Sequence, residues 1–143
     1  MKTSRGFSLL ELLIVVAIIL IIATIAIPSL LKSRQSANES AAVSNLRLLN
    51  TAEVTYASTN NNAYGTVAQL VSAGLLDARF NLVVSGYSFS VTPSANALDY
   101  TSNATARSIN DGKFDYYSRP DYVIRYSTDP TRAPTGLTGE PVR

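Results

Sequence analysis

A long apolar run dominates the N-terminal third of the chain. It begins at Phe7 and contains one charged residue, Glu11, before Lys32. The uncharged part, Leu12 to Leu31, would extend roughly 30 Å as a helix, which matches the hydrocarbon thickness of a bilayer. The pattern therefore predicts a membrane-spanning helix, in which a carboxylate is costly and needs a partner.

The residues on either side of the run indicate its orientation and leave two alternatives. Both flanks are basic, with Lys2 and Arg5 before the run and Arg34 after it, so the charge bias alone is a weak guide. A short basic N-terminus followed by an apolar segment is also typical of export signals, which places the N-terminus in the cytoplasm. A cleaved secretory signal would have a shorter apolar core and a small-residue cleavage site, which residues 28–32 do not offer. A plain single-pass anchor is the other alternative.

A three-to-four spacing continues beyond the run and predicts that the helix extends as an amphipathic segment over residues 32–59. Pro28 predicts a kink or local melting within the helix. Asn50 is assigned to the polar face. The stripe expected to pack on the rest of the chain comprises Leu30/Leu31, Arg34, Ala37, Ala41, Ser44, Leu48, Ala52 and Tyr56.

The remainder, residues 60–143, is predicted to form a small β-rich domain. Thr66 and Gln69 have the spacing of a capping box, so a short helix is expected over 66–73, with Gly74 ending it. Tyr87, Phe89 and Val91 alternate with serines, which predicts a strand over 86–92.

Further strands are expected over 98–105 and in a hairpin of 113–117 with 122–127, after a turn at 110–112. Tyr122, Ile124 and Tyr126 should share one face of the last strand. The proline- and glycine-containing tail from Asp129 is expected to lack regular structure. The fold class is therefore α+β, a long N-terminal helix packed on a small antiparallel sheet.

Composition excludes several kinds of chemistry. The 143 residues include no cysteine and no histidine, so disulfides, Ser–His or Cys–His catalysis and His-based metal sites are absent. We expect no enzyme activity and no cofactor. A calcium site would have to come from Asp99, Asp111, Asp115 and Asp121, but their spacing matches no defined loop, and turn-forming aspartates explain the pattern.

A candidate cleavage site lies between Gly6 and Phe7. Cleavage there would create an α-ammonium at Phe7, one helical turn from Glu11, so that two charges of opposite sign could neutralise each other. Glu11 also has a simpler interpretation, an acid that favours the helix dipole and reaches the interface. Removal of residues 1–6 lowers the basic side chains from 12 to 10, equal to the 10 acidic ones. No net basic charge then draws the chain to nucleic acid.

The segment Arg5-Gly6-Phe7-Ser8-Leu9-Leu10-Glu11-Leu12, followed by Pro28, resembles the cleavage and N-methylation motif of type IV pilins. The resemblance is close over residues 1–56 and architectural beyond them. Many pilins close their C-terminal region with a disulfide, so this cysteine-free chain is more similar to cysteine-free, type IVa-like pilins and to type II secretion pseudopilins.

The resemblance implies a division of the chain into a leader (1–6), a transmembrane or filament-core helix (7–31), an amphipathic continuation (32–59) and a head (60–143). It implies cleavage after Gly6 and methylation of Phe7 by a prepilin peptidase, with Glu11 and Pro28 serving assembly. The precursor would lie in the inner membrane with its head outside. The mature chain would form an extracellular helical filament, with an assembly platform and minor pilins as partners.

The implied function is that of a major pilin used in motility, adhesion or DNA uptake. A pseudopilin or a minor pilin is the alternative within the family. A membrane-anchored extracellular binding domain is the alternative outside it. An unanswered question is whether Glu11 meets the Phe7 ammonium of its own subunit or of a neighbour.

Overall fold

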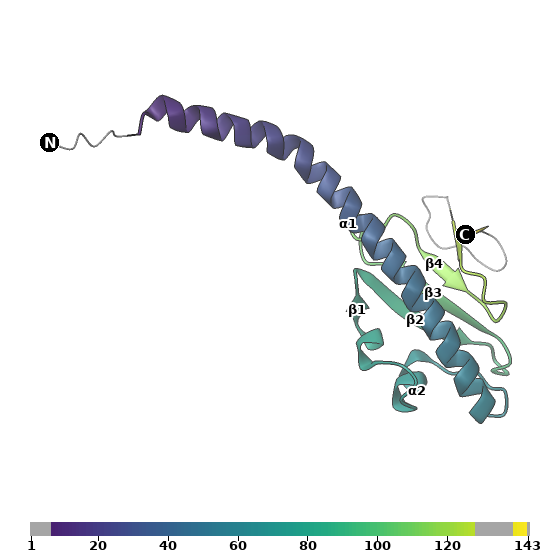
Figure 1. The fold of residues 1–143 in the computed structure, drawn as a ribbon. Helices are drawn as coiled ribbons and strands as arrows, with labels where there is room; N and C mark the ends of the chain where they lie inside the picture. The colour runs from purple at the N-terminus through teal and green to yellow at the C-terminus, as the bar shows by residue number, and fades with distance from the viewer. Residues whose placement is uncertain (1–6, 128–138, 143) are drawn as a thin grey trace. The chain divides into compact units, whose positions relative to one another are not determined.

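The computed structural model describes residues 7–127 and 139–142 (Figure 1). Helix α1 runs from Leu9 to Thr59. It is followed by α2 (Val67–Ser72) and a short 3₁₀ helix, η1 (Ala78–Asn81). The strands are β1 (Val83–Val84), β2 (Tyr87–Pro93), β3 (Tyr100–Ala106), β4 (Tyr116–Ser118), β5 (Arg125–Tyr126) and β6 (Glu140–Pro141).

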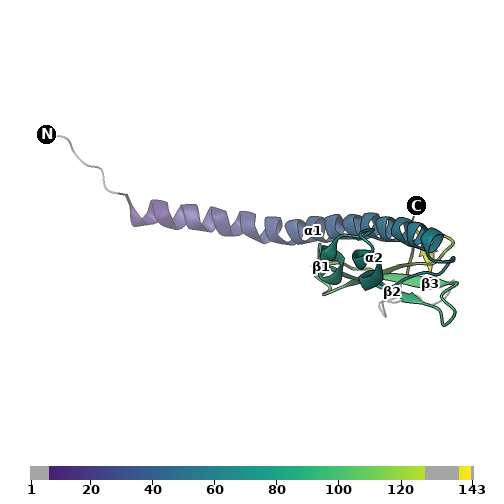
Figure 2. The ribbon, with the colours of Figure 1, turned by 90° about the horizontal axis from the view of Figure 1, so that it is seen from below.

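The strands form one antiparallel sheet in the order β1-β2-β3-β4-β5-β6. The α+β prediction is confirmed, since the second half of α1 packs on this sheet (Figure 2). The chain divides into two compact units, with the boundary inside α1 after Arg34.

Local sequence signals explain the elements that were correctly predicted. Thr66 and Gln69 form both hydrogen bonds of a capping box at the start of α2. Gly74 has a φ of 70°, and its N–H and that of Leu75 donate to carbonyls of α2, which ends the helix. In β2 the alternating residues Tyr87, Phe89 and Val91 are buried, as predicted.

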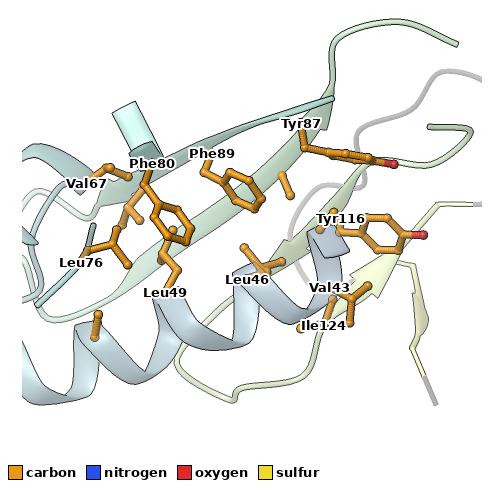
Figure 3. Close-up of a cluster of buried hydrophobic side chains, with 14 of the residues drawn as sticks. Val43, Leu46, Leu49, Val67, Leu76, Phe80, Tyr87, Phe89, Tyr116 and Ile124 are labelled. Atoms are coloured by element: carbon orange, nitrogen blue, oxygen red, sulfur yellow. The ribbon is translucent and has the colours of Figure 1, made fainter. Parts of the chain in front are cut away.

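The core lies between the second half of α1 and the sheet. Leu46 and Leu49 are fully buried there, against Phe80 and Phe89, whose ring centroids are 5.3 Å apart (Figure 3). Tyr87 is also fully buried, and its hydroxyl donates to the carbonyl of Phe114 at 2.7 Å. The core is thus a single aromatic and aliphatic cluster.

The predicted packing face of α1 is only partly correct, because Ala52 is buried and Tyr56 packs against the core, whereas the other buried residues of the helix lie outside the predicted stripe. The buried residues are Ala42, Val43, Leu46, Leu49, Asn50, Ala52, Glu53 and Ala57. Leu48, from the predicted stripe, is 46% exposed, whereas Asn50, assigned to the polar face, is 3% exposed. Both faces of this segment contain leucine. The spacing of apolar residues therefore predicts a helix, but packing against the sheet determines which face of the helix is buried.

Two predictions in the C-terminal part also need correction. The strand expected over 122–127 is limited to β5, because Tyr122 lies in a turn with a φ of 60° and its N–H donates to the carbonyl of Arg119. The end of the expected irregular tail forms β6, which pairs Arg125 with Pro141 at the edge of the sheet. An edge strand tolerates proline because it needs fewer backbone donors. Residues 128–138 of that tail lie outside the described residues.

Candidate assembly site

The N-terminal turn of α1, Phe7 to Glu11, is the candidate assembly site. Gly6 lies outside the described residues, while Phe7 is described and 77% exposed. Ser8 precedes the first helical residue, and its N–H donates to Glu11 Oε2 at 3.0 Å. This is the acidic half of a capping box, which satisfies one of the unpaired N–H groups at the helix start.

The same contact directs the Glu11 carboxylate toward the start of the chain. The Ser8 nitrogen that it binds is joined through one residue to the nitrogen of Phe7, the atom that cleavage would convert into an ammonium. An α-ammonium there would be a stronger donor than the Ser8 amide, because it is charged. The carboxylate therefore binds a backbone nitrogen one residue away from the atom that cleavage would charge.

The first part of α1 is exposed along its whole length. The apolar side chains from Leu9 to Leu31 are mostly 46% or more exposed, and the most apolar window of the helix is 0% buried with a mean hydropathy of 3.1. Exposed apolar surface on this scale marks a membrane or protein interaction region. The helix is long and apolar enough to cross a membrane.

α1 remains helical through Pro28, so the local melting that the sequence allowed does not occur. Proline lacks an N–H, so it cannot donate to the carbonyl of Thr24, four residues earlier. The Thr24 hydroxyl donates at 2.7 Å to the carbonyl of Ile21 in the preceding turn. Pro28 is thus a point of weakened backbone hydrogen bonding in an otherwise regular helix.

The sequence did not predict that two polar residues of α1, Asn50 and Glu53, would be buried against the rest of the chain. The Asn50 amide donates to Ser118 Oγ at 2.8 Å, and its carbonyl accepts from the hydroxyls of Tyr100 and Ser102, both at 3.1 Å. Asn50 therefore ties α1 to β3 and β4. The position of Asn50 along the helix could have indicated its burial, since Asn50 lies on the same helical face as Leu46 and Leu49.

Glu53 is the second of these residues and is fully buried. Its Oε2 accepts the N–H of Gly65 at 3.0 Å, whereas Oε1 has no hydrogen-bond partner in the described part of the chain. Burial raises the pKa of Glu53 from 4.5 to about 7, and the Gly65 hydrogen bond opposes the rise. A buried carboxyl of this kind makes stability depend on pH.

The four aspartates considered for calcium do not share a site. Asp99 pairs with Arg119 and Asp121 with Arg125. Asp111 accepts from Ser108, and Asp115 accepts the N–H of Ala106. No group of three or more acidic residues that could hold a metal occurs within residues 7–127 and 139–142.

Comparisons with known proteins find similarity in the N-terminal sequence. Residues 1–27 match the prokaryotic N-terminal methylation motif. The chain is 38% identical over 85 residues to the type IV wide pilus major component PilA4 of Thermus thermophilus, which covers 59% of this chain and 65% of the relative. It is 49% identical over 53 residues to the type IV major pilin protein PilA of Myxococcus xanthus, covering 37% of this chain and 24% of the relative. No solved structure is significantly similar to it.

Proposed function

We propose that this chain, which carries the N-terminal methylation motif and is similar to type IV pilins, is the major structural subunit of a type IV pilus. The proposal rests on the methylation motif over residues 1–27, which includes the start of an apolar helix. No part of the described structure covers this apolar helix. Both relatives are described as major pilus subunits, although the chain spans only 65% and 24% of their lengths.

Maturation comes first in the proposed sequence of events. A prepilin peptidase removes residues 1–6 by cleaving between Gly6 and Phe7, and the new N-terminus is methylated. The precursor is held in the inner membrane, where lipid covers the apolar part of α1. Residues 60–143 lie outside the membrane, on its non-cytoplasmic side. Since the 20 uncharged residues from Leu12 to Leu31 are enough to span the hydrocarbon region as a helix, this part of α1 is long enough for that role.

Assembly then exchanges lipid for neighbouring helices. Helices gain little hydrophobic free energy on leaving one apolar environment for another, so other interactions must select the packing. The Phe7 ammonium and the Glu11 carboxylate are both costly in an apolar filament core unless they are paired. We propose that their pairing, within a subunit or between neighbours, sets the register of each helix as it enters the filament.

The experiment that tests this function is N-terminal mass analysis of sheared surface filaments. The expected result is a chain that begins with methylated Phe7. Filaments built from a chain that retains residues 1–6, or surface filaments that lack this chain, would contradict the proposal. Loss of protein secretion rather than of surface filaments on deletion would instead assign the chain to a type II secretion pseudopilus.

A further inference from the structure

A pocket of about 350 Å³ lies beside residues 36–47 of α1. The proposed function above does not use it. The apolar lining of the pocket, called the floor below, consists of Val43, Tyr116 and Val142, and Figure 3 shows the first two at one end of the core. Its rim is polar and includes Glu39 and Arg47, two turns apart on the same helix. The pocket therefore combines an apolar floor with one acid and one base.

The charged residues of the rim can still bind a ligand in addition to their contacts within the described part of the chain. Arg47 is exposed and forms no ion pair with any residue that the structure describes. Glu39 accepts the backbone N–H of Lys113 at 2.7 Å, but a carboxylate can accept further hydrogen bonds. The Lys113 ammonium itself lies over the ring of Phe114, 5.0 Å from its centroid. The rim therefore retains capacity for a ligand with both charges.

We propose that this pocket receives the mature N-terminal turn of a second copy of the chain. The proposal rests on the function above, because the positive charge exists only after cleavage before Phe7. In this arrangement the Phe7 ring lies on Val43, Tyr116 and Val142. The Phe7 ammonium and the Glu11 carboxylate stay paired as proposed above, with Glu39 beside the ammonium and Arg47 beside the carboxylate. Charge complementarity and the apolar floor thus select the same occupant.

The occupant cannot come from the same chain. Residues 9 and 39 belong to one continuous helix, so the turn that starts this helix cannot fold back onto the side chain of Glu39 in the same chain. The two helices run in the same direction, because Phe7 precedes Glu11 and Glu39 precedes Arg47. Like-directed helices are what a filament of identical subunits with one polarity requires.

Site-directed disulfide formation tests this contact directly, because the chain has no cysteine of its own. One variant combines Ser8→Cys with Ser44→Cys, a residue that lines the pocket. The matched control combines Ser8→Cys with Ser58→Cys, another exposed serine on α1. A disulfide needs Cα atoms within about 7 Å, so neither pair can form within one chain.

We expect cross-linked dimers and longer chains in oxidised filaments of the Ser44 variant and at most traces in the Ser58 variant. Filaments that show no cross-link at residue 44, or equal cross-linking at both positions, would overturn the proposal. Mass analysis of Phe7 in the same filaments tests the proposed function separately, so methylated filaments without the cross-link count against this contact alone.

Charge variants give a second test that does not depend on cysteine. Arg47→Glu should reduce the amount of surface filament at least about tenfold while leaving cleavage after Gly6 unchanged. Arg79→Glu is the control, since Arg79 is also exposed and forms no ion pair within the described residues. Normal filament levels with Arg47→Glu would refute the proposal.

The double exchange Glu39→Arg with Arg47→Glu separates this contact from a simple interaction between the two rim residues. Both charges then oppose those of the incoming N-terminal turn, so filament levels should stay low. Recovery of filaments in the double variant would mean that Glu39 and Arg47 serve each other and not a second copy, and the proposal would fail.

Discussion

Replacement of Glu53 by glutamine should stabilise the head at neutral and alkaline pH and have a much smaller effect under acidic conditions. Glu53 is fully buried, with one oxygen bound by the Gly65 N–H and the other without a partner in the described structure. A glutamine has nearly the same shape, and its carbonyl oxygen can accept the same N–H. The substitution therefore removes the ionisable group without opening a cavity.

The magnitude follows from the raised pKa. The folded chain holds the Glu53 proton up to about pH 7, whereas the unfolded chain releases it near 4.5. Between these values the folded state binds more protons, so the free energy of unfolding falls as the pH rises. The full loss is about 3 kcal/mol, of which roughly 2 to 3 kcal/mol falls between pH 5 and pH 8.

Urea unfolding of the full mature chain in detergent micelles, followed by the near-ultraviolet signal of its tyrosines, measures this loss. The stabilisation by Glu53→Gln should grow by about 2 to 3 kcal/mol from pH 5 to pH 8. Glu39→Gln is a matched control, because Glu39 also accepts one backbone N–H but is partly exposed, so its effect should change little. A Glu53→Gln effect that is equal at the two pH values would refute the reasoning.

Three further changes test the N-terminal site and the head. Gly6→Val should block cleavage before Phe7, which a slower-migrating band on a gel would reveal; a normally processed chain would move the cleavage site elsewhere. Glu11→Ala should leave cleavage intact but sharply reduce filament assembly, scored by electron microscopy, and abundant normal filaments would remove the pairing argument. Asn50→Ala should destabilise the head by about 2 to 4 kcal/mol in urea unfolding, because it removes three buried hydrogen bonds and leaves the Tyr100 hydroxyl without its partner, while Ser102 and Ser118 keep only long bonds to carbonyls. An Asn50→Ala loss below roughly 0.5 kcal/mol, the level of an ordinary surface substitution, would show that this network contributes little.

Much of the fold and the candidate site follows from local sequence signals. The apolar run predicts a helix long enough to span a membrane, the Thr66–Gln69 capping box predicts α2, and the alternation from Tyr87 predicts β2. The cleavage motif around Gly6 and Phe7, and its acid at Glu11, is likewise contained in a few consecutive residues. Such features depend on interactions within about one helical turn or one strand, which the order of residues fixes directly.

Tertiary structure decided what those signals left ambiguous. It selected the face of α1 that carries Leu46, Asn50 and Glu53, although a stripe through Leu48 had the same period. It placed Tyr122 in a turn and added β6 from the C-terminal end of the chain. The pocket rimmed by Glu39 and Arg47 also depends on it, since Val142 completes the floor from far along the sequence. These outcomes depend on contacts between segments distant in the chain, where burial and strand pairing, not local periodicity, determine which arrangement has the lowest free energy.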